Sequence, residues 1–165
     1  MASIEYNNSV YIRLTGDASI NQVYEDDYDF KIGKSITLKK GKDISIFASG
    51  TMVKVALDCS KILSQNNIDA EIVNMHTIKP IDFQKVNESA KRSKLIVSIE
   101  EHNVIGGLRS GIAECLANTK HSPRFIFFGI NDTYSKGGEY NYLKEQFGLT
   151  PSAISKKIML KLKEN

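Results

Sequence analysis

A chain of 165 residues that is 41% apolar and 25% charged has the size of one globular domain and can bury a hydrophobic core. Its formal charge of +3 comes from 22 basic and 19 acidic residues whose signs are mixed along the sequence, which argues against a nucleic-acid-binding surface. No apolar run approaches the roughly 20 residues that cross a bilayer, and the opening MASIEYNN lacks the basic start and apolar middle of a signal peptide. We therefore expect a cytoplasmic protein that binds neither nucleic acid nor membrane.

The first forty residues differ in character from the rest. Residues 9–14, SVYIRL, are a β-branched and aromatic run that ends at Thr15-Gly16-Asp17, which predicts a strand followed by a turn. The segment that follows is acidic, with carboxylates at Glu25, Asp26, Asp27 and Asp29. We interpret it as a solvated loop and not as a metal site, because nothing in the sequence fixes these ligands in one geometry.

Strand and helix patterns alternate regularly from residue 43 onward. Apolar runs predict strands at residues 44–49, 70–76, 93–101 and 124–130. Helical spacing predicts helices at residues 52–67, 83–93, 106–118, 143–147 and 152–163, with Asp82 and Thr150 as N-caps of the second and the last. This alternation is typical of right-handed βαβ units. The expected fold class is therefore α/β, a three-layer, doubly wound and mostly parallel sheet.

The two cysteines, Cys59 and Cys115, lie in apolar helical patterns and have no second cysteine or histidine near them at metal-ligand spacing. We predict that both are buried, reduced thiols.

Ligands of open α/β sheets gather at the carboxyl ends of the strands, where this sequence has Gly50-Thr51, His76-Thr77, Glu101-His102 and Gly129. Strand alternation places Glu100 and His102 on one face and Glu101 on the other. A Glu–His pair could act as acid and base or supply two metal ligands, but spacing places no third ligand and no nucleophile beside it. We favour the alternative that Glu101 and His102 bond loop backbone or contact another subunit, and we predict no catalytic and no metal-binding residue.

The glycine pair Gly106-Gly107 also has two interpretations. Its amides could bind an anion at a helix start, or small residues could let the helix approach another chain closely. Ile-Gly-Gly-Leu matches neither a dinucleotide-binding motif nor a P-loop, so we favour the second interpretation. Arg109, two residues further on, is either a solvent-facing helical arginine or an interface contact.

Several motifs occur in a fixed order over residues 41–164: GKDISIFASGTMVKVALDCSKIL, NMHTIKPID, SIEEHNVIGGLRSGIAE, FFGINDTY and FGLTPSAI. In this order they resemble the C-terminal domain of transketolase and of its relatives, deoxyxylulose-phosphate synthase and the β subunit of the 2-oxoacid dehydrogenases. The resemblance implies that residues 41–165 form this domain. It also implies that residues 1–40 are the tail of a preceding pyrimidine-binding domain and its linker.

The resemblance implies that the cofactors, thiamine diphosphate and Mg²⁺, bind between two domains upstream of this one. The family's Gly-Asp-Gly motif, followed further on by an Asn, holds them there. The nearest string here is Thr15-Gly16-Asp17-Ala18, which lacks the last glycine, and residues 41–48 contain no Asn. We therefore expect no cofactor-binding residue in this chain, and we expect the chain to be inactive by itself.

The resemblance also implies a homodimer and upstream diphosphate- and pyrimidine-binding domains as partners. The expected interface and structural residues are Glu101, His102, Asn103, Gly106, Gly107 and Arg109. In transketolases, an arginine that binds the sugar phosphate follows the strand that corresponds to VYIRL. This sequence has Thr15-Gly16 at that place. Arg13, within the strand, is a weak candidate to replace that arginine. Two alternatives to a supporting domain stay open: an adaptor that docks a separate protein, and a small-molecule module that uses the Gly106-Gly107 amides.

Overall fold

The computed structural model describes residues 2–15, 23–24 and 27–164. Its strands are β1 (Ile36–Lys39), β2 (Ile44–Ala48), β3 (Ala70–Asn74), β4 (Leu95–Asn103) and β5 (Arg124–Ile130). Its helices are α1 (Met52–Gln65), α2 (Phe83–Arg92), α3 (Leu108–Ala117), α4 (Tyr140–Gln146) and α5 (Pro151–Lys163). The strands form one sheet in the order β1-β3-β2-β4-β5. No helix in the described part of the chain is long and apolar enough to span a membrane.

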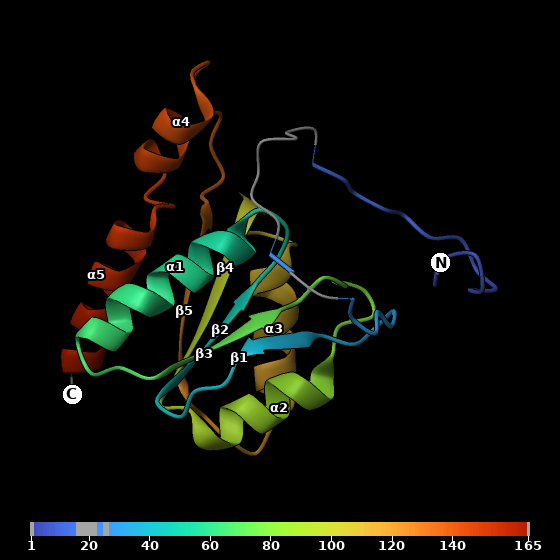
Figure 1. The fold of residues 1–165 in the computed structure, drawn as a ribbon, viewed down its shortest axis with the longest axis horizontal. Coiled ribbons are helices and arrows are strands. Elements are labelled where there is room, and N and C mark those ends of the chain that lie inside the picture. Colours follow the sequence, from blue (N-terminus) through green and yellow to red (C-terminus); the bar gives the residue numbers. More distant parts are fainter. Residues whose placement is uncertain (1, 16–22, 25–26, 165) are drawn as a thin grey trace.

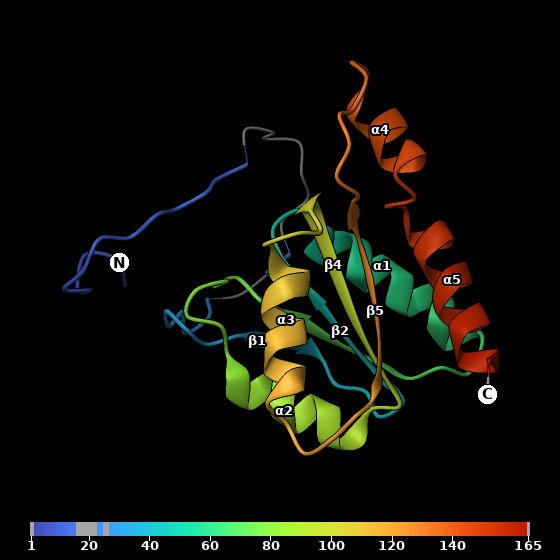
Figure 2. The ribbon, with the colours of Figure 1, turned by 180° about the vertical axis from the view of Figure 1, so that it is seen from behind.

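The sheet is mostly parallel and lies between two helical layers, which confirms the predicted fold class. β3, β2, β4 and β5 run parallel, and only β1 is antiparallel to its neighbour β3. Helices α1 and α5 bury their apolar faces on one side of the sheet, and α2 and α3 do so on the other (Figures 1 and 2). The central strand β2 is therefore flanked by two hydrophobic layers, which explains why it is buried at every residue.

The predicted strand at residues 9–14 is wrong within this chain. Residues 9–14 pair with no strand among the described residues, and their side chains are exposed. Figure 1 shows this segment running away from the sheet. The sheet contains instead β1, a strand that the sequence analysis placed in the linker. The assignment of residues 1–40 to the tail of another domain stays a prediction.

Two helix starts confirm the predicted N-caps. The Asp82 carboxylate accepts a hydrogen bond from the Lys85 amide at 3.2 Å and two more from Ser35, one from its amide and one from its hydroxyl. At the start of α5, the Thr150 hydroxyl accepts from the Ala153 amide at 3.3 Å, and Pro151 occupies the first turn. Asp82 thus caps α2 and also fixes the chain that leads into β1. Both cysteines are buried, as predicted.

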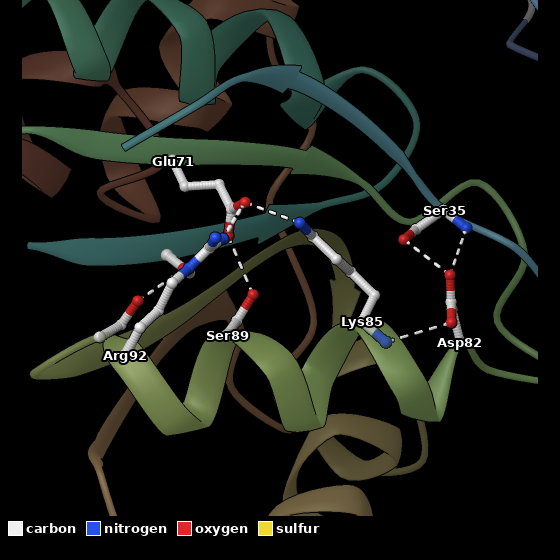
Figure 3. A network of polar contacts seen from close by, with 8 residues as sticks. Ser35, Glu71, Asp82, Lys85, Ser89 and Arg92 are labelled. Atoms are coloured by element: carbon white, nitrogen blue, oxygen red, sulfur yellow. Dashed lines mark hydrogen bonds and ion pairs between the residues drawn. The ribbon is translucent and has the colours of Figure 1, made fainter. Parts of the chain in front are cut away.

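A buried carboxylate, Glu71 of β3, anchors α2 to the sheet (Figure 3). It accepts hydrogen bonds from the Ser45 hydroxyl of β2 at 2.7 Å and from the Ser89 hydroxyl of α2 at 2.9 Å. Lys85 at 2.7 Å and Arg92 form ion pairs with its other oxygen. Burial alone would raise the pKa of Glu71, but these hydrogen bonds and charges outweigh burial and lower the pKa below its ordinary value.

We predict that Glu71→Gln lowers the free energy of unfolding by on the order of 2 to 4 kcal/mol at pH 7, because it leaves two cations without their buried partner. A carboxylate with a lowered folded-state pKa stabilises the fold above its unfolded pKa of about 4.3, and this stabilisation is lost as the pH falls through the folded value. The difference between wild type and variant should therefore shrink in acid. Urea unfolding between pH 7 and pH 3 measures it, with Glu88→Gln on the exposed face of α2 as the control. A difference that stays constant with pH would contradict the prediction.

Candidate functional site

The sheet topology defines one edge position where a ligand would be expected. The chain leaves β2 through α1 toward β3 on one side, and it leaves β4 through α3 toward β5 on the other. The loops that follow β2 and β4 therefore diverge, which makes the carboxyl ends of these two neighbouring strands the topological switch point of the sheet. Thr51 follows β2 at this point, and Glu101 lies near the end of β4.

The side chain of Glu101 connects three elements at this switch point. Its Oε2 atom accepts a hydrogen bond from the hydroxyl of Thr51, the residue before α1. The same oxygen accepts a second hydrogen bond, at 2.7 Å, from the hydroxyl of Tyr140, the first residue of α4. At the position where related folds bind ligands, this chain therefore joins β4, α1 and α4 to one another.

Glu100 points into the opposite helical layer and caps α3. Its carboxylate is buried and accepts hydrogen bonds from the amides of Leu108 at 2.7 Å and of Arg109 at 2.8 Å. Amides at a helix start have no partner within the helix and favour an anion. Here that anion is a carboxylate of the same chain, so these amides are not available to a ligand.

The glycine pair serves this internal contact. A Cβ atom at Gly107 would overlap the Glu100 carboxylate, and Gly106 has a φ of +79°, which disfavours other residues. The Gly106 amide donates to the Ser110 hydroxyl at 2.9 Å. The predicted close approach is therefore present, but the structure places it against Glu100 of the same chain. Contact of this segment with another chain stays a prediction.

The predicted strand alternation holds only in part. Glu100 and Glu101 do point to opposite layers, as their contacts with α3 and α1 show. The pairing of β4 with β5 becomes irregular after Ile99, where four residues of β4 up to Asn103 pass against two of β5. The His102 side chain, inside this irregularity, is exposed and makes no hydrogen bond or ion pair with the other side chains that the structure describes. The Glu–His acid–base pair considered above does not form.

The loop after β4 is ordered by Asn103. The Asn103 side-chain oxygen accepts from the Ile105 amide at 2.8 Å, and its amide group donates to Asp132 at 3.1 Å. Val104 is buried, whereas the Ile105 side chain is 64% exposed. We call residues 101–107, the end of β4 together with the loop that follows it, the contact loop, because this anchored segment presents His102 and Ile105 to the outside.

The side chains of the two arginines singled out by sequence make other contacts than those of Glu101. The Arg109 guanidinium lies 3.9 Å from the centre of the Phe127 ring of β5. Arg13 belongs to the exposed segment of residues 9–15. The Gly16-Asp17-Ala18 string that was compared with the diphosphate motif lies outside the described residues. Among the described residues, no three His, Cys, Asp or Glu side chains gather at a point where they could hold a metal ion.

The sequence predicted that His76 lies at the carboxyl edge of the sheet, but it did not predict the aromatic residue that packs on its ring. The Phe30 ring packs on the His76 ring, with 4.2 Å between their centres, and the Tyr24 hydroxyl accepts a hydrogen bond from the Asn74 side chain. Burial lowers the pKa of His76, and the charge of Asp82 offsets part of this effect. Aromatic residues within the acidic segment are the sequence signal that could have indicated these contacts.

Comparison with known proteins assigns the family. A sequence model for "Transketolase, C-terminal domain" matches residues 33–154. The chain belongs to this family. It is 39% identical over 162 residues to a transketolase C-terminal section from Methanocaldococcus jannaschii, a match that covers 97% of this chain and 50% of that protein. It is 38% identical over 151 residues to a 6-deoxy-6-sulfo-D-fructose transketolase subunit from a Clostridium species, covering 92% of this chain and 46% of that subunit.

A solved structure agrees with this assignment. The protein described as "Split gene transketolase, inactive beta4 tetramer" matches with a TM-score of 0.80 and 35% identity over 85% of this chain and 46% of its own. The chain is thus a transketolase C-terminal domain or a fragment of a split-transketolase subunit. It spans about half the length of the relatives named above.

We predict that Glu100→Gln lowers the free energy of unfolding by about 1 to 3 kcal/mol, because an amide cannot accept both α3 hydrogen bonds or complement the helix dipole equally well. Urea unfolding at pH 7 measures the loss. Glu114→Gln, the same change at an exposed residue of α3, is the matched control and should have little effect. Equal stability of the two variants would contradict a capping role for Glu100.

Proposed function

We propose that this chain is the non-catalytic C-terminal part of a transketolase-like thiamine-diphosphate enzyme and that it supports dimerisation and the assembly of the upstream domains. The observation that supports the proposal is that the carboxylates at the switch point make hydrogen bonds within the chain. Glu101 is held by Thr51 and Tyr140, and Glu100 is held by the start of α3. Both carboxylates therefore hold the starts of helices in place, which is a structural role.

The cofactor belongs, in this proposal, to the upstream domains of the complete enzyme. Thiamine diphosphate with Mg²⁺ supplies the carbanion chemistry of ketol transfer when bound there. One feature supports this division of labour: the chain spans about half of relatives that are named as transketolase sections or subunits. The solved relative is named as a split-gene transketolase, which supports an upstream part on a separate chain.

The contact loop is the surface that we assign to assembly. Its first half is fixed by the hydrogen bonds of the Glu101 and Asn103 side chains, and the residue that follows it, Leu108, is fixed because its amide donates to Glu100. The loop nevertheless leaves His102 and Ile105 exposed. An apolar side chain held outward by a rigid loop favours burial against another domain or subunit over solvent exposure. We therefore expect the complete enzyme to be a homodimer in which this loop is buried.

The proposal predicts separate effects on assembly and on turnover. In the complete enzyme, His102→Ala should weaken dimerisation by on the order of 1 to 3 kcal/mol, because a buried hydrogen-bond partner is left unpaired. Turnover per assembled dimer should change much less than the hundredfold or more that follows loss of a general acid or base. Sedimentation and turnover at saturating enzyme concentration, measured on the same preparation, give both quantities. His121→Ala, in the loop before β5, is the control for loss of an imidazole elsewhere.

The contradicting outcome is specific. A large loss of turnover with an intact dimer would show that His102 acts on the substrate or the cofactor, and the non-catalytic assignment would then be wrong.

A further inference from the structure

The segment that leads into β1 passes the carboxyl end of β3. We call residues 27–35 the strap; they form no helix or strand. One end of the strap is fixed, because the amide and the hydroxyl of Ser35 both donate to the Asp82 carboxylate, at 2.8 and 3.0 Å (Figure 3). Close to this end, Gly33 has a φ of +81°, and a Cβ atom there would lie 3.1 Å from the Pro80 ring. This end of the strap therefore lies against the start of α2.

The other end of the strap is tied to the sheet through aromatic rings. Tyr28 stacks on Tyr24 with 3.9 Å between ring centres, and the Tyr24 hydroxyl accepts a hydrogen bond from the Asn74 side chain. Between the two ends, the Phe30 ring packs on the His76 ring at 4.2 Å. Phe30 is nevertheless 40% exposed, so this contact buries only part of its apolar surface. The middle of the strap is thus held less firmly than its ends.

The imidazole beneath Phe30 is suited to its neutral form. Its Nδ1 atom lies 2.9 Å from the Thr77 hydroxyl, which can serve a neutral ring as donor or acceptor. The His76 Nε2 atom is buried and has no hydrogen-bond partner among the described residues. A protonated ring carries a hydrogen on both nitrogens. With Phe30 in place, the charged Nε2–H would have neither an acceptor nor water, which is unfavourable.

The charged groups around this ring offset only part of that effect. At the start of α2, the Asp82 carboxylate raises the pKa of His76, but burial lowers the pKa by more. In the strap, Asp29 and Lys31 flank Phe30, but they pair with each other at 2.6 Å and are largely exposed. The face of a phenyl ring attracts a cation weakly, whereas a buried, charged N–H without a partner costs more. The closed arrangement therefore favours the neutral imidazole.

We propose that residues 29–32 are a pH-sensitive flap, which stays closed on His76 while the ring is neutral and opens when the ring takes up a proton and its Nε2–H turns to water. The ties of Ser35 and Tyr28 remain, because neither involves the imidazole. In the open form the ring has an ordinary pKa of about 6.5, and in the closed form its pKa is lower. The closed form is therefore favoured above about pH 6.5 and loses this advantage as the pH falls below it. This property belongs to the chain itself and does not depend on the function proposed above.

A tryptophan at position 30 reports on the contact, because the chain contains no tryptophan. In the Phe30→Trp chain, acrylamide should quench the emission more strongly at pH 5.5 than at pH 7.5. The ratio of open to closed form should rise by up to about tenfold, which is the most that uptake of one proton allows over this range. Adding His76→Gln, which is neutral at every pH, should remove the dependence. His102→Gln and His121→Gln make the same change at the other two histidines and should preserve it.

Two further measurements keep the test decisive. Far-UV circular dichroism should stay constant over the same pH range, which separates opening of the flap from unfolding. In the unmodified chain, an NMR titration should give His76 a pKa below about 6.5. A His76 that titrates at or above this value overturns the inference. So does quenching that is independent of pH, that keeps its pH dependence with His76→Gln, or that changes only together with loss of helix.

Discussion

Two adjacent carboxylates at the end of one strand hold together the carboxyl edge of this sheet. Because successive side chains of a strand point to opposite faces, Glu100 reaches α3 in one helical layer and Glu101 reaches Thr51 and Tyr140 at the starts of α1 and α4. One short segment of β4 therefore fixes where helices of both layers begin. The course of the loop after β4 and the position of α4 depend on these hydrogen bonds.

The same arrangement bears on two of the functions that the sequence left open. A small-molecule module would need the amides at the start of α3, but Glu100 occupies them. An acid–base mechanism would need Glu100 or Glu101 beside His102, but both carboxylates are held elsewhere and His102 is exposed. A domain that supports its neighbours needs only a rigid surface. The contact loop, with Ile105 held outward, has that property.

The sequence predicted those parts of the fold that depend on local patterns. The parallel strands follow from apolar runs, and the Asp82 cap follows from a polar residue placed just before a helical pattern. The prediction of a strand at residues 9–14 is wrong because composition indicates a tendency to form a strand but does not show whether a neighbouring strand is there to pair with it. Strand β1 was missed because it pairs antiparallel with β3, outside the βαβ alternation. The roles of Glu71 and Glu100 depend on residues that are distant in sequence or brought near by a loop, so residue type and spacing could not reveal them.

The most direct test of the account is a calorimetric titration of the isolated chain with thiamine diphosphate and Mg²⁺, with a complete transketolase as positive control. If this chain supports a site that other domains form, no heat of binding should appear at micromolar cofactor, while the control binds under the same conditions. Saturable binding to the isolated chain at micromolar cofactor would contradict the account, because the carboxyl edge would then be part of a cofactor site and not only a scaffold.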